Sequence, residues 1–120
     1  MYRILTILLL CVITSAASAM SIDSLYIVTY TTGASWDQSK GPAEQPFFKE
    51  HSSRLSQLRK DGVIKFGARY AEKGIIVIAA PSMIKAKEII NADVAISNNL
   101  FVADIQKLSI FYDGCLERPK

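Results

Sequence analysis

The hydrophobic and polar positions of the chain change their period along its length, and each change predicts an element. Residues 24–32, SLYIVTYTT, are rich in β-branched and aromatic side chains and predict a strand. Residues 33–45, GASWDQSKGPAEQ, contain the residue types that form turns and predict a long loop. A helix is expected from Pro46 to Gly62, because the side chains of one helical face recur at steps of three, four and three, at Phe48, His51, Leu55 and Leu58.

The second half of the chain predicts two more strands, a helix and a final strand. The two strand-like runs are separated by a short AEKG segment, whose length and composition suit a hairpin. Ser82 is suited to cap the helix that follows, because its hydroxyl can accept a hydrogen bond from the first helical turn. The expected elements are strands at 63–70 and 74–80, a helix at 83–90, a short helical turn within 91–99 and a strand at 102–112.

This βαββαβ order is typical of an α+β, ferredoxin-like domain, in which an antiparallel four-stranded sheet carries both helices on one face. Along 63–70 the side chains alternate, and one face is expected to carry Ile64, Phe66, Ala68 and Tyr70. The strands at 24–32 and 74–80 are apolar on both faces. In a sheet with one solvent-exposed face, apolar and polar residues should instead alternate along each strand. We therefore expect a second copy of the chain to cover the face without helices, giving a homodimer.

Residues 1–19 carry the pattern of a secretory signal peptide. Arg3 precedes an apolar run at 4–13, and small residues follow as far as Ala19. We expect cleavage after Ala19, which would leave 20–120 as a single mature domain in the periplasm or outside the cell. An apolar run of about ten residues is too short for a membrane anchor, which needs roughly 20.

Length and composition limit the class of protein. The 120 residues are 50% hydrophobic and 21% charged, which suits one globular domain with a substantial core. The net charge of +3, or +2 after the loss of Arg3, is too small to indicate a nucleic acid or an anionic membrane as a partner. The mature chain would keep only Cys115, so it could form no internal disulfide. One histidine without a cysteine cluster argues against a metal site, and no glycine-rich phosphate loop indicates a cofactor.

His51, the one histidine, takes an apolar position on the helical stripe and should face the sheet. An enclosed imidazole paired with a carboxylate is held in one tautomer and can exchange a proton near neutral pH. The alternative is a histidine that is simply hydrogen-bonded in or beside the core. Asp61 lies about 15 Å further along a straight helix and cannot be the partner. Asp93 follows the second helix, which packs beside the first, and could either reach His51 or cap a turn.

Several of these segments match the pattern of a known family. They are the strand LYIVTY, the helix in which His51 is followed by L-x-x-L and then Asp61 and Gly62, the FGA turn at 66–68, and the segment that ends in Asp93. Together they cover most of the mature domain and resemble the YCII-related (YciI-like) proteins of the dimeric α/β-barrel superfamily. The resemblance implies a homodimeric barrel with an active-site pair made by His51 and Asp93. Some relatives act on lactones or chlorinated ring products.

The chain departs from the family pattern next to these residues. Val94 and Ala95 stand where many relatives have proline and an aromatic residue, and Ala68 and Arg69 stand where a glycine-proline pair is common. The proline would help to aim the preceding aspartate. Losing the proline frees the backbone that would aim Asp93.

Three further residues are candidates for binding a ligand. Arg69 is a cation that could hold a carboxylate, Tyr70 could line a pocket, and Trp36 in the long loop could cover one. Each also has a structural alternative, at a solvated strand edge or in the core. The function we expect is cofactor-independent acid/base chemistry on a small organic acid, lactone or ring compound. The alternative is a non-catalytic extracytoplasmic module that binds a small ligand or serves only as a dimeric interaction domain.

Overall fold

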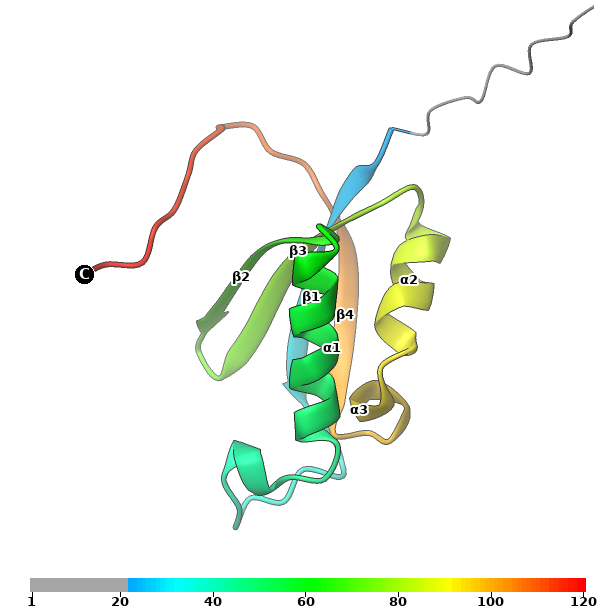
Figure 1. Ribbon diagram of the computed structural model, residues 1–120, viewed down its shortest axis with the longest axis vertical. Helices are drawn as coiled ribbons and strands as arrows, with labels where there is room; N and C mark the ends of the chain where they lie inside the picture. The colour runs from blue at the N-terminus through cyan, green and yellow to red at the C-terminus, as the bar shows by residue number, and fades with distance from the viewer. Residues whose placement is uncertain (1–21) are drawn as a thin grey trace, which may run out of the picture.

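Four strands form one antiparallel sheet in the order β2-β3-β1-β4, and the helices lie on one side of it (Figure 1). This is a computed structural model that describes residues 22–120, so the predicted signal peptide at 1–19 lies outside the described residues. The elements are β1 (Ser24–Thr32), η1 (Pro42–Glu44), α1 (Phe48–Lys60), β2 (Ile64–Tyr70), β3 (Lys73–Ala80), α2 (Met83–Asn91), α3 (Val94–Ser97) and β4 (Phe101–Leu108). The expected α+β class, with an antiparallel sheet of four strands and helices on one side, is confirmed. Within residues 22–120, no helix combines the length and the apolar character needed to span a membrane.

The core lies between the sheet and the helices. Val28 of β1 and Ile78 of β3 are fully buried there, and Ile90 of α2 is 1% exposed. Each buried valine or isoleucine stabilises the fold by roughly 1.5–3 kcal/mol. Ser82 caps α2 as predicted, because its hydroxyl oxygen accepts a hydrogen bond from the Lys85 N–H at 3.2 Å. Apolar contact therefore holds the helices on this face, and the cap sets where α2 begins.

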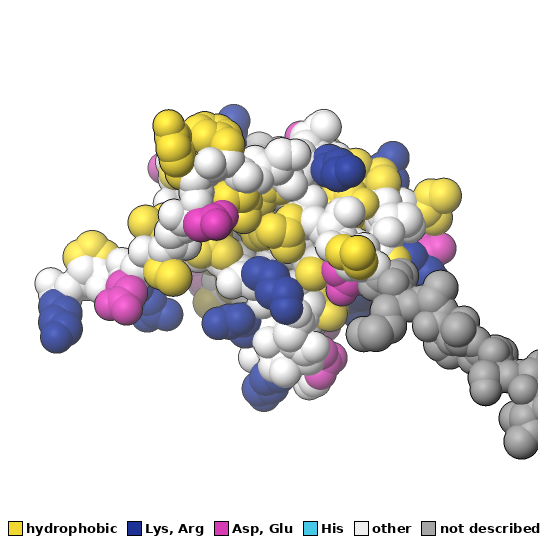
Figure 2. Space-filling model, turned by 90° about the horizontal axis from the view of Figure 1, so that it is seen from above, with side chains coloured by type: hydrophobic (Ala, Val, Ile, Leu, Met, Phe, Trp, Pro, Cys, Tyr) yellow, Lys and Arg dark blue, Asp and Glu magenta, His cyan; other side chains and the backbone are white. Residues whose placement is uncertain are grey.

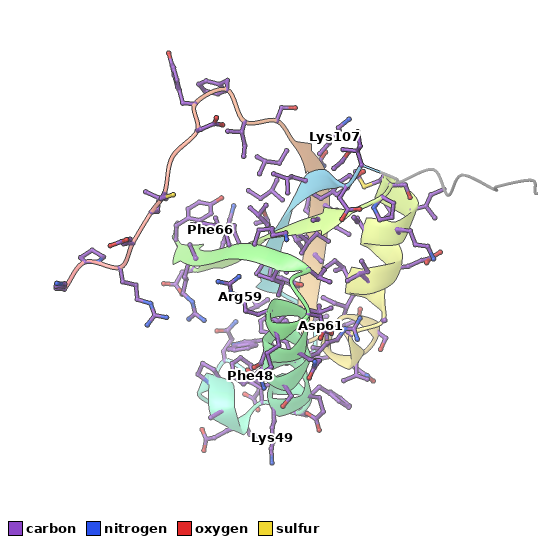
Figure 3. The ribbon with its side chains drawn as sticks, turned by 45° about the horizontal axis from the view of Figure 1, so that its top comes forward. Phe48, Lys49, Arg59, Asp61, Phe66 and Lys107 are labelled. Carbon is purple, nitrogen blue, oxygen red and sulfur yellow. The ribbon has the colours of Figure 1, made fainter. Side chains whose placement is uncertain are left out.

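A β-bulge in β2 changes which side chains face the helices. Ile64 pairs with Ile78, but Phe66 pairs with Val77, so the register shifts between Ile64 and Phe66. Phe66 therefore points to the face away from the helices, and Figure 3 shows it on the side of β2 opposite to α1. The prediction that Ile64 and Phe66 share a face is wrong, because the bulge inserts an extra residue into the alternation.

The last strand ends earlier than its pattern predicts. The apolar run continues to Tyr112, but β4 ends at Leu108, which pairs with Leu25 near the start of β1. Because β1 begins only one residue before Leu25, it offers almost no backbone for a longer ladder. Residues 109–120 leave the sheet as an exposed tail (Figure 1), which carries the free thiol of Cys115. Seen from this end of the domain, hydrophobic side chains lie at the surface among lysines and arginines (Figure 2).

The face of the sheet away from the helices is apolar across the central strands, and no helix of the described residues covers it (Figure 1). At its β4 edge, Gln106 and Asp104 lie on the same face, opposite Ile27 and Thr29 of β1. Ile27 of β1 pairs with Val77 of β3, and the flanking pairs on the same strands bring Leu25 and Ile75 to the same side. Phe66 extends this surface across β2. We call this surface the open face. Its composition agrees with the expectation that the central strands are apolar on both sides.

Candidate functional site

His51 lies on the inner face of α1 and is 7% exposed, so it faces the sheet as expected. The centroid of its ring lies 5.3 Å from that of Tyr30 on β1 and 4.9 Å from that of Phe101 on β4. Leu55, one turn further along α1, packs against the core on the same stripe. The helix therefore presents its one imidazole at a position that the surrounding pattern would give to an apolar side chain.

Asp93 is the partner of His51. The Asp93 Oδ2 atom lies 2.6 Å from His51 Nδ1, and Asp93 is 2% exposed. Its other oxygen, Oδ1, accepts a hydrogen bond from the Ala95 N–H at 2.9 Å and so caps α3. Asp93 is thus both a helix cap and the partner of His51, with one carboxylate oxygen for each contact. The cap on α3 therefore aims the carboxylate at His51, although no proline follows Asp93.

The surroundings of Asp93 favour its charged form. Burial raises the pKa of Asp93, but the hydrogen bonds from His51 and from the Ala95 N–H, together with the nearby charges of His51 and Arg54, outweigh burial and lower it below 3.8. Arg54 is held in this region because its Nη2 donates a hydrogen bond to the Ile89 carbonyl at 2.7 Å. The ionised Asp93 carboxylate accepts a hydrogen bond from His51 Nδ1–H. When the imidazole is neutral, its lone pair is therefore on Nε2. No described residue forms a hydrogen bond with Nε2.

A cavity of about 380 Å³ opens beside His51. Its wall is aromatic, because Tyr30, Trp36, Phe48 and Phe101 line it together with the imidazole. Phe101 is the centre of this wall, with its ring centroid 5.6 Å from that of Trp36 and 6.3 Å from that of Phe48. Figure 3 shows Phe48 at the beginning of α1. The volume lies at the lower end of the range of about 300–1,000 Å³ that is usual for small-molecule sites.

The long loop between β1 and α1 places Trp36 at the cavity. The loop starts at Gly33, where a Cβ atom would lie 2.1 Å from the carbonyl oxygen of Asn99, so only glycine allows this close approach to the start of β4. Within the loop, the buried Gln45 side chain donates from Nε2 to the Asp37 carbonyl at 2.7 Å and accepts the Asp37 N–H at 3.0 Å. The pattern analysis assigned no role to Gln45, because a single glutamine in a polar loop carries no periodic signal.

The β2–β3 hairpin supplies the polar side of the cavity. Arg69 lines it, and so does Glu72 from the turn. Of the three predicted ligand-binding residues, the structure therefore brings Arg69 and Trp36 to the cavity. Tyr70 does not line it, because it is 53% exposed and shares the open face with Phe66. Neighbours along a strand point to opposite faces, and here Arg69 takes the cavity side.

Within residues 22–120, no group of three or more histidine, cysteine, aspartate or glutamate residues comes close enough together to hold a metal ion. No protein-family model matches the chain, and no curated protein matches it. The function is therefore inferred from the geometry of the site itself.

Proposed function

We propose that the chain catalyses proton transfer on a small organic acid, lactone or ring compound, with His51 and Asp93 as a cofactor-independent acid/base pair. The observation that carries this proposal is the 2.6 Å contact between His51 Nδ1 and Asp93 Oδ2 at the wall of a cavity. A histidine that serves only the core needs one hydrogen-bond partner but no adjoining space. Here the ring has a buried carboxylate on Nδ1 and also lines a cavity.

The proposed step starts with the neutral imidazole. His51 Nε2 takes a proton from a carbon next to a carbonyl group of the ligand, and the C–H electron pair stays on the ligand as an enolate. The imidazolium that forms is stabilised by the Asp93 carboxylate at Nδ1. Return of the proton to the same or to a different carbon of the enolate, directly or after it has exchanged with solvent while bound to Nε2, regenerates neutral His51. Arg69 is placed to hold a carboxylate group of the ligand during this cycle.

The proposal includes the family and the assembly of the protein. The order of the elements and the order of the strands support a ferredoxin-like domain of the YCII-related type. The open face supports a homodimer in which two sheets face each other as a dimeric α/β barrel, because large exposed apolar patches mark interaction surfaces. The pattern of residues 1–19 supports export to the periplasm or beyond.

Hydrogen exchange tests the catalytic proposal without knowledge of the natural substrate. The purified protein is incubated in D₂O with pools of small lactones, keto acids and ring acids, and ¹H NMR follows the loss of C–H signals. We expect exchange in at least one pool, falling by roughly 100-fold or more in His51→Ala, since general acid/base catalysis contributes on this scale. Ser56→Ala, an exposed change on α1, is the matched control. Equal exchange by wild type and a folded His51→Ala variant would contradict the proposal.

A non-catalytic binding module is the second candidate, because the aromatic wall and Arg69 would hold a ligand without any chemistry. In that case small acids should raise the melting temperature of the protein while no pool exchanges its C–H protons. His51→Ala would then weaken binding only modestly. The same two measurements therefore separate the enzyme from the binding module.

A further inference from the structure

Two glycines line the cavity although neither the backbone nor the packing requires them. Gly67 of β2 and Gly74 of β3 both lie on the helix side of the sheet. A Cβ atom at Gly67 would lie 3.7 Å from Ile76 Cγ2, and one at Gly74 would lie 3.9 Å from Tyr30 Cβ, which are ordinary van der Waals distances. Neither residue has a positive φ. Gly33, with a backbone oxygen 2.1 Å from its virtual Cβ, shows what a required glycine looks like.

Glycine inside a strand normally costs stability relative to alanine, because it loses more backbone freedom on folding and packs no side chain. Glycines in strands are retained where a ligand or another backbone comes close. The one backbone atom within 4 Å of either Cβ position is the Ile75 carbonyl oxygen, 3.8 Å from that of Gly67, which is an ordinary van der Waals distance that a side chain would tolerate. Both glycines face the same cavity, so the feature they share is access for a ligand.

We propose that Gly67 and Gly74 form the floor of a slot for a flat, conjugated ring that carries one carboxylate, and that Arg69 binds this carboxylate. This inference rests on the proposed use of the same cavity by a small organic ligand. It adds the shape and the charge of that ligand. The ring would lie between the glycine backbone on one side and the aromatic wall around Phe101 on the other.

The charge of the ligand follows from the two charged side chains of the hairpin. Arg69 is the direct cross-strand neighbour of Gly74, so no opposing side chain crowds its guanidinium group. Among the described residues, Arg69 has no ion-pair partner, and a guanidinium can bind a carboxylate through two parallel hydrogen bonds. Glu72 also lines the cavity. Its negative charge disfavours a second carboxylate, so the slot should prefer a monoanion to a dianion.

Trp36 provides a direct measure of binding, because it is the single tryptophan of the chain and lines the cavity. Its fluorescence is recorded while the purified protein is titrated with four probes: benzoate, benzamide, cyclohexanecarboxylate and phthalate. Calorimetry gives the same constants without an optical signal. We expect benzoate to bind at least tenfold more tightly than the uncharged amide, the non-planar acid and the dianion. Arg69→Gln should remove the preference for benzoate over benzamide.

Substitution of the glycines separates a ligand role from a structural one. Gly67→Ala and Gly67→Val should keep or raise the melting temperature, because the added Cβ atom would make only ordinary van der Waals contacts and the change improves strand propensity. The same variants should weaken benzoate binding, the valine variant by at least tenfold. Gly114→Val, in the exposed tail, is the matched control and should leave binding unchanged.

Three results would overturn the inference: no binding of benzoate at millimolar concentration, equal binding of the four probes, or unchanged binding by a folded Gly67→Val variant. A lower melting temperature in Gly67→Ala would also count against it, since it would show that packing needs the glycine. These measurements do not depend on turnover. Failure of the exchange experiment with His51→Ala would therefore leave the slot standing, and failure of the slot would leave proton transfer to be tested.

Discussion

The two faces of the sheet are built from the same strands but carry different kinds of surface. On the helix side, β1 contributes Tyr26, Val28 and Tyr30, each at most 6% exposed, and this side also holds the hydrogen-bonded His51–Asp93 pair and the cavity. On the open face, the same strand contributes Leu25 and Ile27, and no described element covers them. Helices exclude water where polar chemistry is placed, whereas the open face combines the apolar residues of β1, β2 and β3 with Asp104 and Gln106 at its β4 edge. In the proposed function, the helix side binds the ligand and the open face contacts a second copy of the chain.

The largest effect is expected from a charge on the open face. Ile27→Glu would bury an uncompensated carboxylate in each half of the proposed dimer, while in a monomer the same carboxylate would stay hydrated. Because the symmetric dimer buries two such charges, it should weaken at least 1,000-fold, which is about 4.1 kcal/mol. Sedimentation velocity at micromolar concentration measures this.

Ile84→Glu is the matched control for this experiment, because Ile84 is 72% exposed on α2 and lies on the helix side. It should leave the sedimentation coefficient unchanged. A wild-type protein that sediments as a monomer, or an Ile27→Glu variant that stays dimeric, would break the assignment of the open face to a second copy.

The next effect concerns the buried pair on the helix side. Asp93→Ala removes the α3 cap, which is worth about 0.5–2 kcal/mol, and leaves His51 Nδ1 without a partner, which costs about 1–3 kcal/mol more. Urea unfolding should show a loss of about 3 kcal/mol in the free energy of unfolding. Asp93→Asn keeps an oxygen that can cap Ala95, so it should lose less stability while proton transfer still fails. Equal losses in the two variants would mean that the cap contributes nothing.

The pH dependence of stability gives a second measure of how much the charged Asp93 carboxylate stabilises the fold. The folded pKa of Asp93 lies below its ordinary value of 3.8, so the stabilisation from its charge is present above that pH and is lost as the pH falls through the lower folded pKa. Melting temperatures of wild type should therefore drop on acidification below about pH 4. Asp93→Asn should show a flatter profile.

Asp37 provides the control for the acid profile. The hydrogen bonds from Ser39 lower the pKa of Asp37 as well, but this carboxylate lies in the solvent-accessible loop. Asp37→Asn should therefore flatten the profile less than Asp93→Asn does. The reverse order would place the acid-sensitive carboxylate outside the buried pair.

The periodic part of this structure could be predicted from the sequence, because apolar side chains mark every strand and both long helices. The same stripe predicted an inward His51, and the order of elements left Asp93 as a carboxylate within reach. The contact itself depends on the cap geometry of α3, which follows from tertiary packing rather than from spacing. No pattern of residue types could show that one oxygen of Asp93 would cap α3 while the other would contact His51.

Other parts of the site follow from events that carry no periodic signal. The bulge between Ile64 and Phe66 is one extra residue in β2. From Phe66 onward, each side chain lies on the face opposite to the one that simple alternation from Ile64 predicts. The cavity is lined in part by Gly67 and Gly74, and a glycine in a sequence first indicates a turn or a break in an element. The loop fold depends on three hydrogen bonds of Gln45, whose partners are backbone groups of any residue type.

The smallest effect concerns Tyr30, which lies beside the His51–Asp93 pair. Its hydroxyl is buried and has no hydrogen-bond partner among the described residues. Burial, and then the negative charge of Asp93, raise its pKa above the ordinary value of 10.0, so the unfolded chain loses this proton first and stability falls above about pH 10. Tyr30→Phe removes the unpaired hydroxyl and should add about 1 kcal/mol to the free energy of unfolding at neutral pH. The variant should also lose less stability than wild type above about pH 10. A less stable Tyr30→Phe would show that the hydroxyl does find a partner. A more stable variant with weaker ligand binding would show that the helix side keeps a destabilising hydroxyl because its cavity uses it. The apolar residues at the centre of the open face include no such group.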